Sequence, residues 1–310
     1  MKKNSKIFIA GGSGMVGSAI LRSLKKRKYN NILYPNSSKL NLTSQTDVDL
    51  WFKKNHPEYV FLCAGKVGGM FSNINYPADY SVINTLIITN VINSSFKYNV
   101  KKLQFMASSC AYPIQRGNKK LRPEMLLSSP MEPTNIHYSL AKINGYYTCL
   151  GFNKQHGTNY ITSMPCNIYG VGDNYSAEHS HVIPALIRKF HNAKVNNFKK
   201  IYMQGSGNVK REFLYVDDLA EASIFLMHKY NEGKLINVGS GKDISIRNLA
   251  NIIKKVTSFE GKIIFNNKKP EGVKRKLLDV TVLNELGWKQ KIDLITGLTR
   301  AYKYYKKNVI

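Results

Sequence analysis

The sequence predicts an α/β fold with a doubly wound parallel sheet and a smaller mixed α/β domain toward the carboxyl end. Through the first half of the chain, short apolar segments alternate with helix-length amphipathic segments. This alternation is typical of βαβ units. A glycine-rich turn follows the first apolar segment. Because parallel crossovers are right-handed, successive units wind helices onto both faces of one sheet.

The composition is that of a globular protein. The chain has 310 residues, of which 43% are hydrophobic and 21% charged. No apolar run approaches the roughly 18–20 residues that cross a bilayer, and the amino end has the pattern of a buried strand, not of a signal peptide. The four cysteines lack CxxC spacing and an associated histidine cluster. We therefore expect free thiols, no metal site, no membrane association and a cytoplasmic location.

The formal net charge of +27 is unusual for such a chain. A basic protein attracts polyanions, nucleic acid among them. Here the lysines are scattered over amphipathic segments instead of forming one stripe, so we expect no specific nucleic-acid binding. A basic surface also favours capture of a substrate that carries a diphosphate.

Five strands and four helices are predicted for the first half of the chain. The predicted strands are 6–10, 31–34, 59–64, 102–108 and 160–167, and the predicted helices between them are 16–26, 45–54, 84–98 and 138–155. Together they predict a Rossmann-like NAD(P)-binding domain over residues 1–168.

Beyond residue 169 the pattern loosens. We expect helices at 181–190 and 217–230, the second capped by Asp217 or Asp218, and a strand at 200–203. Ser245 is placed to cap a helix that runs to residue 256. The substrate-binding domain is predicted to comprise 169–213 and 241–310, with about 214–240 returning to the first domain.

The turn after the first strand has the spacing of a dinucleotide-binding loop. Its glycines fit both GxxGxxG and GxGxxG, which allow a tight turn and close approach of the backbone to a pyrophosphate. A tight turn alone would also explain them, but the position within a βαβ series favours nucleotide binding. The predicted cofactor contacts here are Gly11, Gly12, Ser13, Gly14, Met15, Val16 and Gly17.

The end of the second predicted strand bears on the choice of cofactor. A carboxylate there would hold the adenosine ribose of NAD, and this chain has none. Ser37, Ser38 and Lys39 offer hydroxyl and ammonium groups to a 2′-phosphate instead. We therefore expect NADPH, with NADH the less favoured cofactor.

Tyr138 and Lys142 form a YxxxK sequence on a predicted helix, where positions i and i+4 share a face. A nearby ammonium group is expected to lower the phenol pKa, so that Tyr138 exchanges a proton near neutral pH. An amphipathic helix face would also explain the spacing. Ser108, at the end of the fourth predicted strand, strengthens the catalytic interpretation because its hydroxyl can bind a substrate carbonyl.

These residues resemble the extended short-chain dehydrogenase/reductases, and the match is closest to the GDP-L-fucose synthase family. The resemblance covers nearly the whole chain. It rests on the glycine turn, the Ser-Tyr-Lys set and the segments 66–69, 108–113, 132–135, 179–186, 211–218, 237–241 and 275–281.

The resemblance implies two reactions on one substrate: epimerisation of GDP-4-keto-6-deoxymannose at C3 and C5, then reduction at C4 with NADPH. It implies that Cys110 and His181 serve as acid and base for epimerisation. Asn167, Lys142 and His181 are implied to contact the cofactor. The resemblance also implies a homodimer built through the helices expected at 84–98 and 138–155.

The resemblance assigns the diphosphate to Arg211 and Lys276, and it places Lys189 and Gln204 in the sugar pocket. There the family has an arginine and a tryptophan, respectively. Ser13 replaces a family arginine in the glycine turn, and the arginines after the second strand are missing. These departures weaken the expectation of strict NADP use and leave the sugar open.

Two alternatives follow. The first is C4 reduction without epimerisation, on a related GDP-4-keto sugar such as a heptose in surface-polysaccharide synthesis. The second is a catalytically silent nucleotide-binding regulator or a nucleic-acid binder. The intact Ser108, Tyr138 and Lys142 argue against the second alternative.

Overall fold

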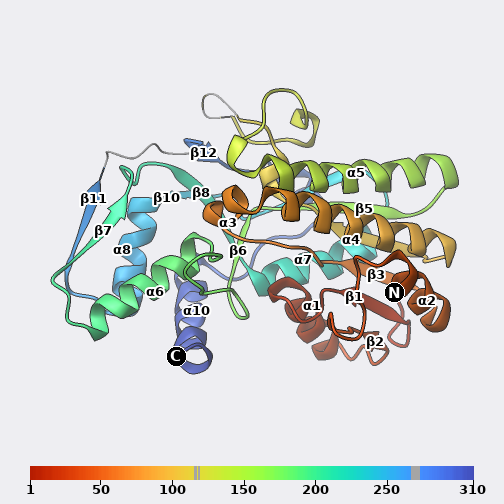
Figure 1. Cartoon of the computed structure of the whole chain (residues 1–310), viewed down its shortest axis with the longest axis horizontal. Helices are drawn as coiled ribbons and strands as arrows, with labels where there is room; N and C mark the ends of the chain where they lie inside the picture. Colours follow the sequence, from red (N-terminus) through yellow and green to blue (C-terminus); the bar gives the residue numbers. More distant parts are fainter. Residues whose placement is uncertain (115–116, 118, 267–272) are drawn as a thin grey trace.

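The computed structural model describes residues 1–114, 117, 119–266 and 273–310 (Figure 1). Its main sheet holds six parallel strands in the order β2-β1-β3-β4-β5-β9. This sheet confirms the predicted doubly wound fold. The strands are β1 (Ile7–Ala10), β2 (Ile32–Leu33), β3 (Tyr59–Leu62), β4 (Lys102–Met106), β5 (Tyr160–Pro165) and β9 (Leu235–Val238).

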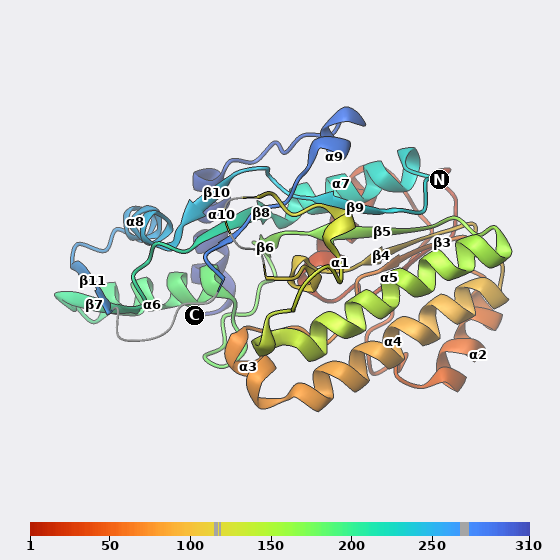
Figure 2. The same cartoon turned by 90° about the horizontal axis from the view of Figure 1, so that it is seen from above.

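Helices cover both faces of this sheet (Figure 2). On one face, α1 (Met15–Lys26) packs against α7 (Val216–Lys229). On the other, α2 (Gln45–Asn55), α4 (Pro77–Lys97) and α5 (Ile136–His156) pack in sequence. Alternate residues of β1 pack into the two hydrophobic cores, one on each face of the sheet, because successive strand side chains point to opposite faces. Ile7 and Ile9 join the core under α1 and α7, whereas Phe8 and Ala10 join the core under α2, α4 and α5.

A second group of strands lies beyond the carboxyl edge of the main sheet (Figure 1). In it, β8 (Lys210–Tyr215) pairs with β6 (Asn167–Tyr169), β10 (Asp243–Ser245) and β12 (Arg275–Lys276). A separate parallel pair joins β7 (Lys200–Gln204) to β11 (Lys262–Asn266). The accompanying helices are α6 (Val182–Val195), α8 (Ile246–Thr257) and α10 (Leu294–Asn308). The short helix α9 (Thr281–Glu285) packs instead on β9 of the main sheet.

Several elements differ from the sequence prediction. Helix α4 begins at Pro77, seven residues before the predicted start, with proline in its first turn where a missing N–H costs nothing. The predicted strand 160–167 is two strands, because β6 leaves the main sheet to pair with β8. A short helix, α3 (Met70–Asn75), was not predicted.

The capping predictions had mixed outcomes. Ser245 caps α8 as expected, accepting a hydrogen bond from the Asn248 N–H. The prediction for α7 is wrong: Tyr215 occupies its N-cap position, and neither Asp217 nor Asp218 caps it. The Asp218 carboxylate is buried and accepts the backbone N–H groups of Lys291 and Ile292, ahead of α10. Among the described residues, no helix is long and apolar enough to cross a membrane.

Candidate active site

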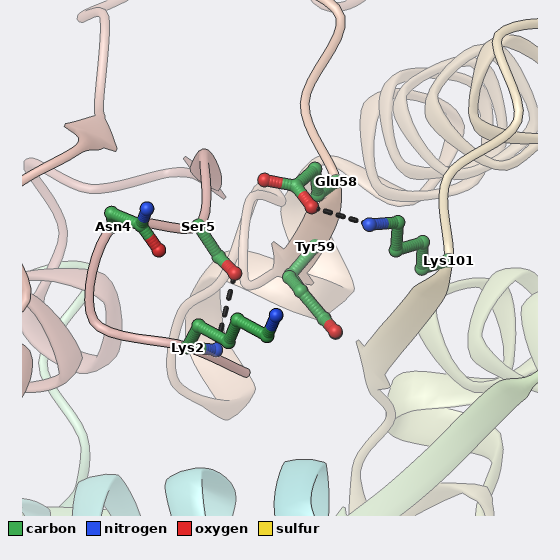
Figure 3. A pocket seen from close by; sticks show the side chains of 6 residues that line it. All are labelled: Lys2, Asn4, Ser5, Glu58, Tyr59 and Lys101. Atoms are coloured by element: carbon green, nitrogen blue, oxygen red, sulfur yellow. Dashed lines mark hydrogen bonds and ion pairs between the residues drawn. The ribbon is translucent and has the colours of Figure 1, made fainter.

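The candidate site lies at the carboxyl edge of the main sheet. The chain leaves β1 toward β2 on one side and returns to β3 on the other, so the order reverses between β1 and β3. Ligands of open α/β sheets bind at such a reversal. A small polar depression lies at the opposite, amino edge, lined by Lys2, Asn4, Ser5, Glu58, Tyr59 and Lys101 (Figure 3). None of the predicted site residues belongs to that depression.

The glycine turn after β1 has no room for side chains. Gly11 has φ +85°, and a Cβ there would lie 2.7 Å from the Ala64 nitrogen. A Cβ on Gly12 would meet Tyr34 at 2.5 Å, and one on Gly17 would lie 2.1 Å from the Gly11 carbonyl oxygen. The turn therefore presents backbone atoms without side chains at these glycines, against the start of α1. We call this surface the glycine cradle.

The amino end of α1 opens from this cradle. Gly14 is its N-cap residue, no side chain caps it, and its first turn has no acidic residue. Ser13 and Gly14 are exposed, whereas Met15 and Val16 are half-buried. Unpaired N–H groups and the helix dipole favour a phosphate at this position, so these residues fit the pyrophosphate of a dinucleotide.

Asn36 organises the turn after β2. Its side-chain oxygen accepts the Ser38 hydroxyl at 2.8 Å and the Lys39 N–H at 3.2 Å. Ser37 and Lys39 are exposed. The turn therefore leaves the Lys39 ammonium group and the Ser37 hydroxyl accessible beside the glycine cradle, where Tyr34 closely approaches Gly12.

Ser108, Cys110 and Tyr138 come together where β4 ends. Ser108 caps a short 3-10 helix at Ser109–Ala111 by accepting the Cys110 N–H. The Ser139 hydroxyl donates to the Cys110 carbonyl at 3.0 Å, which ties this turn to α5. Tyr138 is half-buried, and the Ser108 side chain is near enough to its phenol to lower the phenol pKa. The three predicted residues thus share one site.

The pKa of Tyr138 departs from the sequence expectation. Burial raises it above its usual value of 10.0, and neighbouring Cys110 adds to the rise, although the nearby Ser108 side chain lowers it. The buried Lys142 ammonium group lies 5.7 Å from the Tyr138 ring centroid and donates to the Met106 carbonyl at 2.9 Å. Burial lowers the pKa of Lys142 to about 8. The expected lowering of the Tyr138 pKa by Lys142 is therefore wrong in this structure.

Three further residues enclose Lys142. A Cβ on Gly65 would lie 2.6 Å from the Asn84 side-chain oxygen and 3.7 Å from the Lys142 ammonium nitrogen. Burial raises the pKa of the nearby Cys63 thiol to about 12, while Lys142 lowers it. Sequence reasoning missed these neighbours because β3 and α4 approach α5 only in the folded chain.

His181 lies at the N-cap position of α6. Its side chain reaches solvent, yet the surrounding protein desolvates the ring and lowers its pKa below the usual 6.5. The preceding turn is joined to the segment before α3, since the Gly69 N–H donates to the His179 carbonyl at 3.0 Å.

Arg211 and Lys276 are neighbours across the β8–β12 ladder, in direct register. The Lys276 ammonium group lies 3.1 Å from the Glu132 carboxylate, and both side chains are largely buried. Burial by itself raises the pKa of Glu132, but the charges of Lys276 and Arg211 and two hydrogen bonds hold it below the usual value. Glu132, which sequence reasoning did not assign to the site, is thus the counter-ion of the two predicted diphosphate ligands.

The other predicted contacts lie on separate elements. The Asn167 side chain donates to the Glu212 carbonyl at 2.8 Å, which anchors β6 to β8. Lys189 on α6 donates to the Tyr202 carbonyl on β7, and burial lowers its pKa. Gln204 is exposed at the end of β7. Within the described part of the chain, no cluster of side chains is suited to hold a metal ion.

Comparisons with known proteins agree with this architecture. The model of the NAD dependent epimerase/dehydratase family matches residues 7–239. GDP-L-fucose synthase 1 of Arabidopsis thaliana is 46% identical over 307 residues, covering 99% of this chain and 95% of that protein.

Two solved structures from Campylobacter jejuni are also similar. A GDP-6-OMe-4-keto-L-xylo-heptose reductase superposes with a TM-score of 0.93 at 36% identity, covering 99% of each chain. A GDP-D-glycero-L-gluco-heptose synthase, crystallised in the presence of NADPH, superposes with a TM-score of 0.92 at 35% identity, covering 99% of this chain and 100% of that one.

Proposed function

Because this chain belongs to the NAD dependent epimerase/dehydratase family, we propose that it is an NADPH-dependent nucleotide-sugar 4-ketoreductase of the GDP-L-fucose synthase type. It reduces the C4 ketone of a GDP-4-keto-6-deoxy sugar after epimerising C3 and C5. The observation that carries this proposal is the shared site of Ser108, Cys110 and Tyr138, with Lys142 behind them. The 46% identity to a GDP-L-fucose synthase over nearly the full length supports it.

Reduction needs a proton as well as a hydride. The glycine cradle would hold NADPH, which when bound would supply the hydride for C4. Tyr138 donates its proton to the C4 oxygen, and Ser108 hydrogen-bonds that oxygen as it becomes an alcohol. The raised pKa of Tyr138 keeps the phenol protonated at neutral pH, which suits a proton donor. The Lys142 ammonium group stabilises the phenolate that remains.

Epimerisation uses the acidity of the hydrogens that flank the C4 ketone. In this scheme Cys110 and His181 act on opposite faces of the sugar, one removing the proton and the other returning it at C3 and C5. His181 is mostly neutral near pH 7 because its pKa is lowered, so its ring can accept a proton. Neither the removal nor the return of the proton requires the hydride.

Positively charged side chains bind the phosphate groups of the substrate and of the cofactor. Arg211 and Lys276 bind the diphosphate, and Lys276 exchanges its ion pair with Glu132 for contact with phosphate oxygens. Lys189 and Gln204 contribute to the sugar pocket. Ser37 and Lys39 would bind the 2′-phosphate of NADPH, and Asn167 would contact the nicotinamide end of the cofactor.

We assign residues 1–168 and about 214–240 to the cofactor domain, and 169–213 and 241–310 to the substrate domain. Two helices on the outside of the first, α4 and α5, carry exposed apolar side chains and form the interface of a homodimer (Figure 2). The four free thiols agree with a cytoplasmic location.

A second candidate is C4 reduction alone on a GDP-4-keto-heptose. The observation that favours it is the TM-score of 0.93 to a GDP-4-keto-heptose reductase. Lys189 and Gln204 stand where the family resemblance places an arginine and a tryptophan, so the sugar pocket differs from the family pattern. The higher identity to the GDP-L-fucose synthase places this candidate second.

Turnover of GDP-4-keto-6-deoxymannose and of GDP-4-keto-heptoses, each with NADPH and NADH, tests both candidates when the products are read by NMR. We expect the 6-deoxy sugar to be the better substrate and NADPH the modestly better cofactor. Turnover of the heptoses alone would put the second candidate first. Absence of cofactor oxidation with every sugar would contradict both.

A further inference from the structure

A chain of buried hydroxyl groups leads from Tyr138 to the turn that carries His181. The Tyr80 ring meets the Tyr138 ring edge-on, with centroids 6.1 Å apart. The Tyr80 hydroxyl lies 2.8 Å from the Ser72 hydroxyl, which lies 2.9 Å from Nδ1 of His179. Tyr80 and Ser72 are almost fully buried. Three elements, α4, α3 and the turn before α6, are thus joined by side chains.

The backbone reinforces this connection at two adjacent glycines. A Cβ on Gly68 would lie 2.3 Å from the Tyr80 hydroxyl, and one on Gly69 would lie 2.5 Å from the Ser180 carbonyl oxygen. The Gly69 N–H donates to the His179 carbonyl at 3.0 Å. Only glycine permits both approaches, and this close packing explains the two glycines in the segment 66–69.

One arrangement of protons satisfies the whole chain. Tyr80 donates to the Ser72 oxygen, and Ser72 donates to an unprotonated Nδ1 of His179. The second ring nitrogen of His179 then carries the proton and faces Glu178, whose carboxylate oxygen is 3.9 Å away. If both hydrogen bonds ran in the opposite direction, the proton of the buried Tyr80 hydroxyl would have no acceptor, which costs free energy in a buried site.

We propose that Ser72, Tyr80 and His179 are positioning residues: their hydrogen bonds, with the contact at Gly69, hold the turn 179–181 in place and so aim His181 at the site that contains Tyr138. The consequence for catalysis rests on the proposed function. His181 is the N-cap residue of α6 and its side chain makes no capping hydrogen bond, so the contacts at His179 and Gly69 help to fix its position. Misplacing a proton-transfer group by about 1 Å is enough to reduce rates substantially.

The first test needs no substrate. Amide hydrogen exchange is compared between the wild type, Ser72→Ala and His179→Ala. We expect the Gly69 amide and the amides of residues 176–184 to exchange roughly fivefold to tenfold faster in both variants. Ser95→Ala is the matched control, since Ser95 is equally buried but bonds only within its own helix. Unchanged exchange around Gly69 in Ser72→Ala would overturn the proposal.

The second test separates positioning from stability. His179→Asn retains a polar atom near the position of Nδ1 and should restore wild-type exchange, whereas His179→Ala should not. With substrate, Tyr80→Phe and His179→Ala should slow deuterium exchange at the sugar several-fold more than C4 reduction of a pre-epimerised ketone. Tyr29→Phe is the control, because it removes a tyrosine–histidine hydrogen bond far from the site.

The two tests fail in distinguishable ways. If amide exchange becomes faster in the variants but the ratio of the epimerisation rate to the reduction rate is unchanged, the proposal that these contacts orient His181 is overturned. A wild type that does not epimerise at all would count against the proposed function, and the amide exchange would still decide whether the contacts hold the turn.

Discussion

Tyr138 combines two properties that a proton donor needs. Burial keeps its phenol protonated near neutral pH, and the Ser108 side chain lies near the phenol at the carboxyl end of β4. Lys142, with a pKa of about 8, is still mostly charged at neutral pH and can stabilise the phenolate after transfer. These groups occupy one turn of α5 and the end of β4, so their spacing does not depend on loop motion.

Replacing Tyr138 with phenylalanine removes only this proton donor. We predict that Tyr138→Phe loses C4 reduction by about 10²–10⁴-fold, the usual contribution of general acid catalysis, with an unchanged melting temperature. The measurement is kcat for NADPH oxidation. Tyr147→Phe, an exposed tyrosine on the same helix, is the control and should remain active. Near wild-type turnover by Tyr138→Phe would contradict the assignment.

Glu212 makes the stability of the protein depend on pH. Its carboxylate is almost fully buried and accepts the backbone N–H groups of Gly241 and Leu278. Burial raises its pKa from 4.5 to about 6, although these hydrogen bonds lower it. The folded state therefore keeps a proton that the unfolded chain has already lost, and the contribution of Glu212 to stability falls as pH rises through this window.

We predict that this loss amounts to about 1.5 kcal/mol of unfolding free energy between pH 4.5 and pH 6.5. Glu212→Gln should be less stable at pH 4.5 by about 1–3 kcal/mol, because its amide faces an N–H donor. The difference from wild type should then shrink as pH rises. Urea unfolding across this range measures it, with the exposed Glu232→Gln as control. A difference that stays constant with pH would contradict the prediction.

At the scale of elements, the start of α1 is set by contact between glycines. Gly17 lies so close to the Gly11 carbonyl that a methyl group must displace the helix from the turn. We predict that Gly17→Ala weakens NADPH binding by at least about tenfold, since the helix N–H groups lose their alignment on the pyrophosphate. Titration of NADPH fluorescence measures this.

Gly151 provides the matched control. It lies within α5, and a Cβ there would meet no atom within 4 Å. Gly151→Ala should leave NADPH binding unchanged and stabilise the protein by about 0.5–1 kcal/mol through helix propensity. Equal NADPH affinity in Gly17→Ala and Gly151→Ala would contradict the assigned role of the glycine turn.

Local sequence patterns predicted the elements that depend on local rules. The βαβ alternation identified β1 to β5, and Ser245 marked the start of α8, because strand periodicity and helix capping act over a few residues. The division of 160–167 into β5 and β6 depends on pairing with β8, which is distant in sequence. Asp218 resembled a cap but binds the backbone ahead of α10, a contact that no local pattern reveals.

The candidate site was predictable to a similar extent. The glycine turn, Ser108, Tyr138 and Lys142 follow from spacing within known units. Glu132 and Asn84 were missed because their partners come from other parts of the chain. The pKa of Tyr138 was wrongly expected to be lowered, because its burial cannot be read from the YxxxK spacing.

At the scale of the whole molecule, α4 and α5 lie side by side on the outside of the sheet (Figure 2). Val82 and Leu86 on α4, and Leu140 and Tyr147 on α5, are exposed apolar residues. Exposed apolar patches commonly mark protein interfaces, and self-association of equivalent surfaces produces a symmetric dimer.

We predict that Leu86→Glu combined with Leu140→Glu converts a dimer to a monomer, because burying two carboxylates at the interface is unfavourable. Sedimentation velocity measures the mass. Leu50→Glu, a comparably exposed leucine on α2, should leave the dimer intact. A wild type that sediments as a monomer would contradict the assigned interface.

The central claim is that one site both epimerises and reduces a GDP-4-keto-6-deoxy sugar. The most direct measurement is product NMR after turnover of GDP-4-keto-6-deoxymannose with NADPH in D₂O. We predict deuterium at C3 and C5, a protium from NADPH at C4 and loss of the C3 and C5 deuterium in Cys110→Ser. A product reduced at C4 that retains its original hydrogen at C3 and C5 would contradict it.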